Sequence, residues 1–85
     1  MSKIDKLDFA ILDALLNEFD ATAKLKAVTR KTITTQIDIN KKTLYTRLRK
    51  LMKLGYIING IVEDREHTYY IIEPGIEVLE EAMTK

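Results

Sequence analysis

The sequence has no cysteine, one histidine, one proline and three glycines among its 85 residues. Without cysteine there is no thiol nucleophile, no disulfide and no cysteine-bound zinc, and a single histidine cannot form a histidine-rich metal site. No apolar run approaches the roughly 18 residues that a membrane-spanning helix needs, and the N-terminal MSKIDKLDF carries acidic residues where a signal peptide has an uninterrupted apolar region. We therefore expect a cytoplasmic protein without a metal site.

Features typical of an enzyme are also scarce. The few glycines form no phosphate-binding loop, and no nucleophile is paired with a base in a recognisable motif. The carboxylates are spread along the chain and not paired for acid–base chemistry. We expect no catalytic residues, no cofactor and no enzymatic activity.

The composition is that of one small folded domain. Apolar residues make up 46% of the chain and charged residues 32%, which is typical of a globular protein and not of a disordered tail. A chain of this length buries about 60 to 65% of its unfolded surface, which allows a single modest core. No repeat, low-complexity segment or linker divides the sequence, so we treat residues 1–85 as one domain.

The charged residues are segregated along the chain, although the formal net charge is only +1. Between Lys24 and Lys53 ten basic residues stand against one acid, Asp38, a balance of +9, whereas the other 55 residues have a balance of −8. If the charged residues only formed solvent-exposed surface, acidic and basic residues would be mixed in both regions. The segregation favours a nucleic-acid partner, because neutralising phosphates is the main source of such affinity.

The first periodic segment predicts an amphipathic helix. Apolar residues at spacings of three and four run from about Asp5 to Glu18. Ser2 is a candidate cap for this helix, with Asp5 in the third helical position. Residues 20–28 are less regular, and we interpret them as a connector.

Two capped helices are predicted next. Thr29 is a candidate N-cap for a short helix over residues 30–37, and Asn40 is one for a second helix that ends near Leu54. The few residues between them match the spacing of a helix-turn-helix. The second helix has a cationic face opposite an apolar one, formed by Lys42, Thr46, Arg49 and Lys53.

After this helix the spacing between apolar residues changes from three or four positions to two. Gly55 suits a left-handed C-cap, and the runs Tyr56–Val62 and Thr68–Ile72 predict an antiparallel hairpin with the polar tip EDREH. Pro74 suits the first turn of a last helix, which ends near Met83. We expect Ile76, Leu79 and Met83 to face inward. The predicted fold is mainly α with a β-hairpin, an α+β fold.

Two segments carry a resemblance to a known fold. VTRKTITTQIDINKKTLYTRLRKLMKLGYI has a capped helix, a short turn, a Thr and an aliphatic residue opening a basic helix, and an aromatic-aliphatic entry to a hairpin. YYIIEPGIEVL resembles the exit of that hairpin. Over roughly Leu7 to Leu79 the chain resembles the winged helix-turn-helix domain of transcriptional regulators such as the MarR and PadR families. The resemblance implies a three-helix core, a wing, a C-terminal helix and sequence-specific binding of double-stranded DNA by a transcriptional regulator.

On this interpretation the helix 40–54 enters the major groove with its first turns. The residues expected at base edges are Lys41, Lys42, Thr43 and Thr46. Those expected chiefly at phosphates are Arg30, Lys31, Arg47, Arg49 and Lys50. Tyr45 either touches DNA or packs against the wing. In the wing tip Arg65 is the main candidate, among the acids Glu63, Asp64 and Glu66.

Two other functions stay open. An accessory protein acting at a plasmid or phage DNA site would have the same features. A winged helix can also serve as a protein-interaction module. A salt-dependent shift of duplex DNA in a gel distinguishes DNA binding from protein docking.

We also expect a homodimer with twofold symmetry. A single domain covers only about 600 to 1,000 Å² on DNA, and regulators usually double this footprint by pairing. The expected interface lies on the last helix and on the first, and comprises Phe9, Ile76, Val78, Leu79, Ala82 and Met83. The alternative is a monomer in which the last helix merely closes the core.

Overall fold

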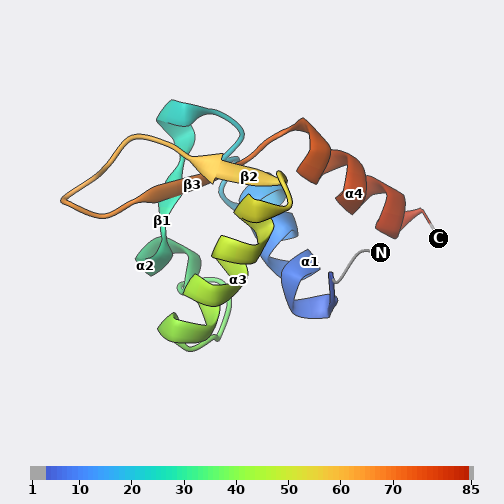
Figure 1. The fold of residues 1–85 in the computed structure, drawn as a ribbon, viewed down its shortest axis with the longest axis horizontal. Helices are drawn as coiled ribbons and strands as arrows, with labels where there is room; N and C mark the ends of the chain where they lie inside the picture. The colour runs from blue at the N-terminus through green and yellow to red at the C-terminus, as the bar shows by residue number, and fades with distance from the viewer. Residues whose placement is uncertain (1–3, 85) are drawn as a thin grey trace.

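The computed structural model describes residues 4–84 and has the predicted α+β fold. In chain order the elements are α1 (Lys6–Asp13), a π-helical turn (Ala14–Glu18), a 3-10 turn (Lys24–Lys26), β1 (Val28–Thr29), α2 (Arg30–Ile33), α3 (Lys41–Lys53), β2 (Ile57–Asn59), β3 (Thr68–Ile71) and α4 (Glu73–Met83). Figure 1 shows α1, α2 and α3 below the sheet, the β2–β3 loop projecting to one side and α4 on the other. The three-helix core, the wing and the C-terminal helix are therefore all present.

The first helix begins later than predicted. Asp5 is its N-cap, and the carboxylate of Asp5 accepts a hydrogen bond from the backbone N–H of Asp8 at 3.1 Å. The carboxylate of Asp8 accepts in turn from the N–H of Asp5 at 3.2 Å, which completes a capping box. The prediction that Asp5 occupies the third helical position is therefore wrong. Ser2, the predicted cap, lies outside the described residues.

The helix-turn-helix has both predicted caps but a shorter first helix. The hydroxyl of Thr29 accepts from the N–H of Thr32 at 3.3 Å, and Asn40 Oδ1 accepts from the N–H of Lys42 at 2.8 Å. α2 ends at Ile33 and not at residue 37. Next to that end the hydroxyl of Thr34 donates to the carbonyl of Lys31 at 2.7 Å. Such side-chain bonds to the backbone compete with continued helix formation, which accounts for the early end.

The sheet is antiparallel, with the strand order β1-β3-β2. The register pairs Ile57 with Ile71 and Val28 with Tyr69. Val28 was predicted as the end of a connector and Thr29 only as a helix cap, because two residues are too few to show a period-two pattern. Pairing with β3 makes β1 a strand. Both hairpin strands are shorter than predicted.

The wing tip is a tight turn. Glu63 and Glu66 pair across it, and Asp64 and Arg65 have φ values of 49° and 67°. Gly55, after α3, has a φ of 82°, which confirms the predicted left-handed C-cap.

One core joins the helices to the sheet. Its buried members are Ile11, Leu12, Leu15, Ala21, Ile33, Leu44, Leu48, Leu51, Ile57, Tyr69, Ile71 and Leu79. The prediction that Met83 faces inward is wrong, because 68% of this residue is exposed near the end of α4. Within residues 4–84, every helix is too short or too polar to cross a membrane.

Candidate nucleic-acid interface

One face of α3 is buried and the opposite face is cationic. Leu44, Leu48 and Leu51 are fully buried and determine which face of the helix packs against the core. The predicted base-edge residues are all exposed on the first turns of α3, and they are Lys41, Lys42, Thr43 and Thr46. Asn40 caps this end of α3, so the helix begins at Lys41 and Lys42.

Tyr45 joins α2 to α3 through two arginines. The guanidinium of Arg30, at the start of α2, lies over the Tyr45 ring at 4.9 Å from the centroid. Arg49, one turn after Tyr45, lies 5.7 Å from the same centroid and donates to the Tyr45 hydroxyl at 3.2 Å. Tyr45 is 38% exposed, so the arrangement lies at the surface. The ring therefore organises two of the predicted phosphate contacts.

An open groove of about 800 Å³ separates α3 from the wing. Its lining comprises Tyr45, Thr46, Arg49, Lys50, Met52, Lys53, Asn59, His67 and Tyr69. Burial raises the pKa of the Tyr69 hydroxyl, and the positive charge of Arg30 opposes that rise. The groove thus has basic groups from α3 along its rim and aromatic rings within it.

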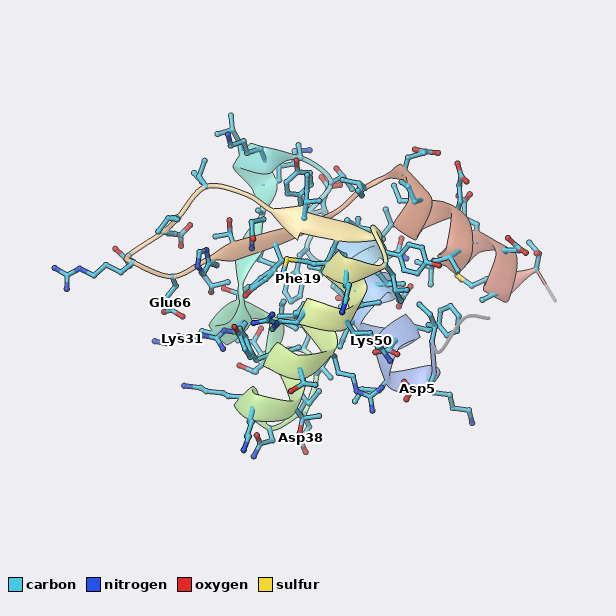
Figure 2. The ribbon with its side chains drawn as sticks, viewed as in Figure 1. Asp5, Phe19, Lys31, Asp38, Lys50 and Glu66 are labelled. Atoms are coloured by element: carbon cyan, nitrogen blue, oxygen red, sulfur yellow. The ribbon has the colours of Figure 1, made fainter. Side chains whose placement is uncertain are left out.

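A smaller hollow of about 220 Å³ lies between the wing and the start of the helix-turn-helix. It is lined by Arg30, Lys31, Lys41 and Glu66. Figure 2 shows Glu66 on the wing next to Lys31 of α2. The hollow is therefore lined by three cations and one carboxylate. Arg65 does not line it and is exposed at the wing tip.

Arg47 and Lys50, both predicted at phosphates, are paired with acids of α1, although Lys50 also lines the groove between α3 and the wing. The guanidinium of Arg47 donates to Asp5 at 2.5 Å and to Asp8 at 3.3 Å. The ammonium of Lys50 forms an ion pair with Asp8. Figure 2 shows Lys50 on the side of α3 that faces α1 and Asp5. We call these four residues the α1–α3 ion cluster.

The ion cluster has a clear electrostatic effect. The hydrogen bond from Arg47 lowers the pKa of the Asp5 carboxyl from its ordinary 3.8 to about 2. The same bond raises the pKa of Arg47. Asp5 was assigned from the sequence only to the start of the helix, and Asp8 to no role. One signal was available, because Asp8 shares a face of α1 with the buried Ile11 and Leu12.

The predicted dimer residues are divided between core and surface. Phe9, Ile76 and Val78 are half-buried, whereas Ala82 and Met83 are exposed near the end of α4. Leu79 faces inward, as predicted, and this burial conflicts with its predicted place in the dimer interface. It is 2% exposed and fills the core of its own chain, so it is not available to a partner. α4 packs against α1, which places the remaining residues on neighbouring helices.

No protein-family model and no curated protein matches the sequence significantly. The chain is similar in structure to TubR from Bacillus megaterium pBM400, with 24% identity, a TM-score of 0.84 and coverage of 98% of this chain and 90% of that one. It is also similar to the DNA-binding TubR fragment from Clostridium botulinum, with 26% identity, a TM-score of 0.74 and coverage of 95% and 99%.

A third similar structure is a zinc-responsive MarR family member, ZitR of Lactococcus lactis. Its identity is 21% and its TM-score 0.76, and the match covers 98% of this chain but only 54% of that one. The chain therefore spans about half the length of this MarR family member. The predicted resemblance is confirmed at the level of the fold, and the chain has the winged-helix fold of these proteins.

Proposed function

We propose that the chain is a sequence-specific protein that binds double-stranded DNA and regulates transcription. The observation that carries the proposal is the exposed cationic face of α3, extended onto α2 by the Arg30–Tyr45–Arg49 arrangement. Basic side chains on a capped, exposed helix suit the major groove, where Lys and Arg bond to guanine acceptors. A DNA partner also implies a cytoplasmic location.

The proposed contacts fall into two classes. Lys41, Lys42, Thr43 and Thr46 lie on the first turns of α3 and meet base edges. Arg30, Lys31 and Arg49 meet phosphates, and Tyr45 holds two of these arginines in place. The hollow lined by Arg30, Lys31, Lys41 and the single acid Glu66 has a net positive charge, which suits a backbone phosphate. Arg65 adds a weaker contact because acids surround it.

The protein works as a homodimer in this proposal. Apolar surface on α4 and α1 supports pairing, and the interface comprises Phe9, Ile76, Val78, Ala82 and Met83. A twofold dimer would read an inverted repeat with half-sites about 10 to 10.5 base pairs apart, or a multiple of that.

A gel-shift experiment over a series of salt concentrations tests the proposal. Genomic fragments that the protein retains serve as the probe, and a shuffled duplex is the control. We expect tight binding, and we expect the logarithm of the binding constant to fall linearly with the logarithm of the salt concentration. Absence of any duplex shift at low salt would contradict DNA binding and would favour a protein-interaction module.

The similarity to TubR from pBM400 favours a second candidate, an accessory protein at a plasmid or phage DNA site. It would use the same face of α3. Sequencing the retained fragments distinguishes the two, because a regulator selects promoter regions and an accessory protein selects sites on its own replicon.

A further inference from the structure

We propose that Asp8, together with Asp5, is a positioning residue that fixes α3 for DNA reading by holding Arg47 and Lys50. In this proposal Arg47 and Lys50 belong to the scaffold and do not contact phosphates. The inference rests on the proposed DNA-binding function and specifies how the surface of α3 is presented.

The burial of Asp8 is the first support. Its side chain is fully buried, yet its carboxylate meets two cations. Arg47 donates to one oxygen at 3.3 Å, and Lys50 forms an ion pair with the other. A buried carboxylate without such partners is strongly unfavourable, so pulling the cations away would leave an unpaired charge.

Charge balance within the ion cluster is the second support. Asp5 and Asp8 contribute two negative charges, and Arg47 and Lys50 contribute two positive charges. The cluster is therefore neutral as a unit. Two of the basic residues of α3 are already compensated inside the protein, and they add little to the field that attracts phosphates.

The direction of the side chains is the third support. At 100° per residue, Arg47 lies about 130° around α3 from the stripe formed by Lys42, Thr46 and Arg49. Lys50 lies only about 70° from that stripe, so its ion pair with Asp8, and not its angle alone, places it on the side of α1. Asp5 and Asp8 are also held by the capping box, whose two hydrogen bonds do not involve α3.

These observations give the cluster a mechanical role. The apolar contacts of Leu44, Leu48 and Leu51 hold α3 on the core. The ion cluster adds directional bonds between α3 and the start of α1. Without them, α3 can rotate or slide slightly on its apolar face, and the lysines at its first turns lose their fixed register with the bases.

Salt dependence separates positioning from phosphate contact. On B-DNA each phosphate contact contributes about 0.9 to the slope of log K against log salt. The assay uses the wild-type chain with a retained genomic duplex and a shuffled duplex. Lys50→Gln and Arg47→Gln should keep the wild-type slope, whereas the matched control Arg49→Gln should lose about 0.9. A loss of about 0.9 in Lys50→Gln or Arg47→Gln would overturn the inference.

Asp8→Asn is the converse test, because it removes the charge that pairs with Lys50 and leaves Arg47 with Asp5 alone, while keeping the shape of the side chain. The ratio of affinities for the retained and shuffled duplexes should fall about tenfold, the scale of one lost base contact, and the slope should steepen. Asp8→Glu, which keeps the charge, should restore part of the ratio. An unchanged ratio and slope in folded Asp8→Asn would overturn the proposal.

Asp5→Asn covers the case in which Asp8→Asn fails to fold, since the Asp5 side chain is 52% exposed. This variant should lower the affinity ratio and steepen the salt slope, as Asp8→Asn does, but by less. An unchanged affinity ratio and salt slope in folded Asp5→Asn would overturn the inference. Failure of the wild type to bind either duplex would refute the DNA-binding function itself. A wild type that binds, with a slope that depends on Lys50, would refute only the positioning role.

Discussion

Arg30 lies over the ring of Tyr45 with 4.9 Å between its guanidinium carbon and the ring centroid. The contact crosses from α2 to α3, so it fixes a cation from one helix against the surface of the next. A cation–π contact at an exposed site is worth about 0.5 to 1 kcal/mol. Its main effect here is to hold the guanidinium of Arg30 beside α3.

Removing the ring tests this contact. Tyr45→Ala should weaken binding to specific and shuffled duplexes alike, by about 0.5 to 2 kcal/mol, because both arginines lose their support. Tyr45→Phe keeps the ring and loses only the hydrogen bond from Arg49, so it should cost less. Fluorescence anisotropy with a labelled duplex measures both. Equal affinities for wild type and Tyr45→Ala would contradict the role of the ring.

Lys42 and Arg49 should have different effects although both are exposed cations on α3. Lys42→Ala should relax base preference at one position of the site, and Arg49→Ala should lower affinity across sequences, each by about 1 to 3 kcal/mol. Binding to a library of single-base variants of the site separates the two effects. A double variant that binds like the wild type would refute the placement of α3 in the major groove.

Acid should weaken the ion cluster in a defined pH range. The pKa of Asp5 is about 2 in the folded chain and 3.8 ordinarily. A depressed folded pKa contributes stability that is fully present above the unfolded pKa and is lost as the pH falls through the folded pKa. Urea unfolding of wild type and Asp5→Asn should therefore differ by a constant amount above about pH 5. The difference should shrink between about pH 4 and pH 2.

The control for the pH experiment is Asp38→Asn, which changes an exposed acid in the turn before α3. A difference between wild type and Asp5→Asn that stays constant down to pH 2 would show that Arg47 does not lower the pKa of Asp5.

Charge on the exposed end of α4 should separate the proposed dimer. Ala82→Glu combined with Met83→Glu should shift the sedimenting mass from about twice 9.8 kDa to 9.8 kDa at tens of micromolar protein. Glu80→Gln, on the polar side of the same helix, is the control and should stay dimeric. A wild-type mass of 9.8 kDa with one protomer per DNA site would refute the dimer.

Gly75 should tolerate no side chain. A Cβ at this position would lie 2.3 Å from the carbonyl oxygen of Tyr56 and 2.8 Å from Ile71 Cγ1. Gly75→Ala should lower the free energy of unfolding by about 1 to 3 kcal/mol, because the start of α4 must move away from the sheet. Gly55→Asn should cost less, since nothing lies within 4 Å of a Cβ there and Asn accepts a left-handed conformation. Urea denaturation compares the two.

The features predicted best from the sequence were those with local causes. Asn40 and Thr29 cap their helices through their own short side chains, and the leucine spacing of α3 fixes which face is buried. The features missed depend on partners distant in sequence. β1 exists only because β3 pairs with it, and the partners of Arg47 lie 42 and 39 residues away. A helical wheel gives the direction of Arg47 but not what α1 presents to it.

Thr29 takes part in two structures at once. Its backbone pairs with Thr68 in the sheet, and its side chain caps α2 through the N–H of Thr32. The hydroxyl of Thr68 donates in turn to the carbonyl of Ile61 on the other arm of the wing, at 2.5 Å. An unbroken series of bonds therefore links the wing to the first turn of the helix-turn-helix. Thr29 therefore anchors α2 to the sheet, so the helix-turn-helix and the wing share one attachment point.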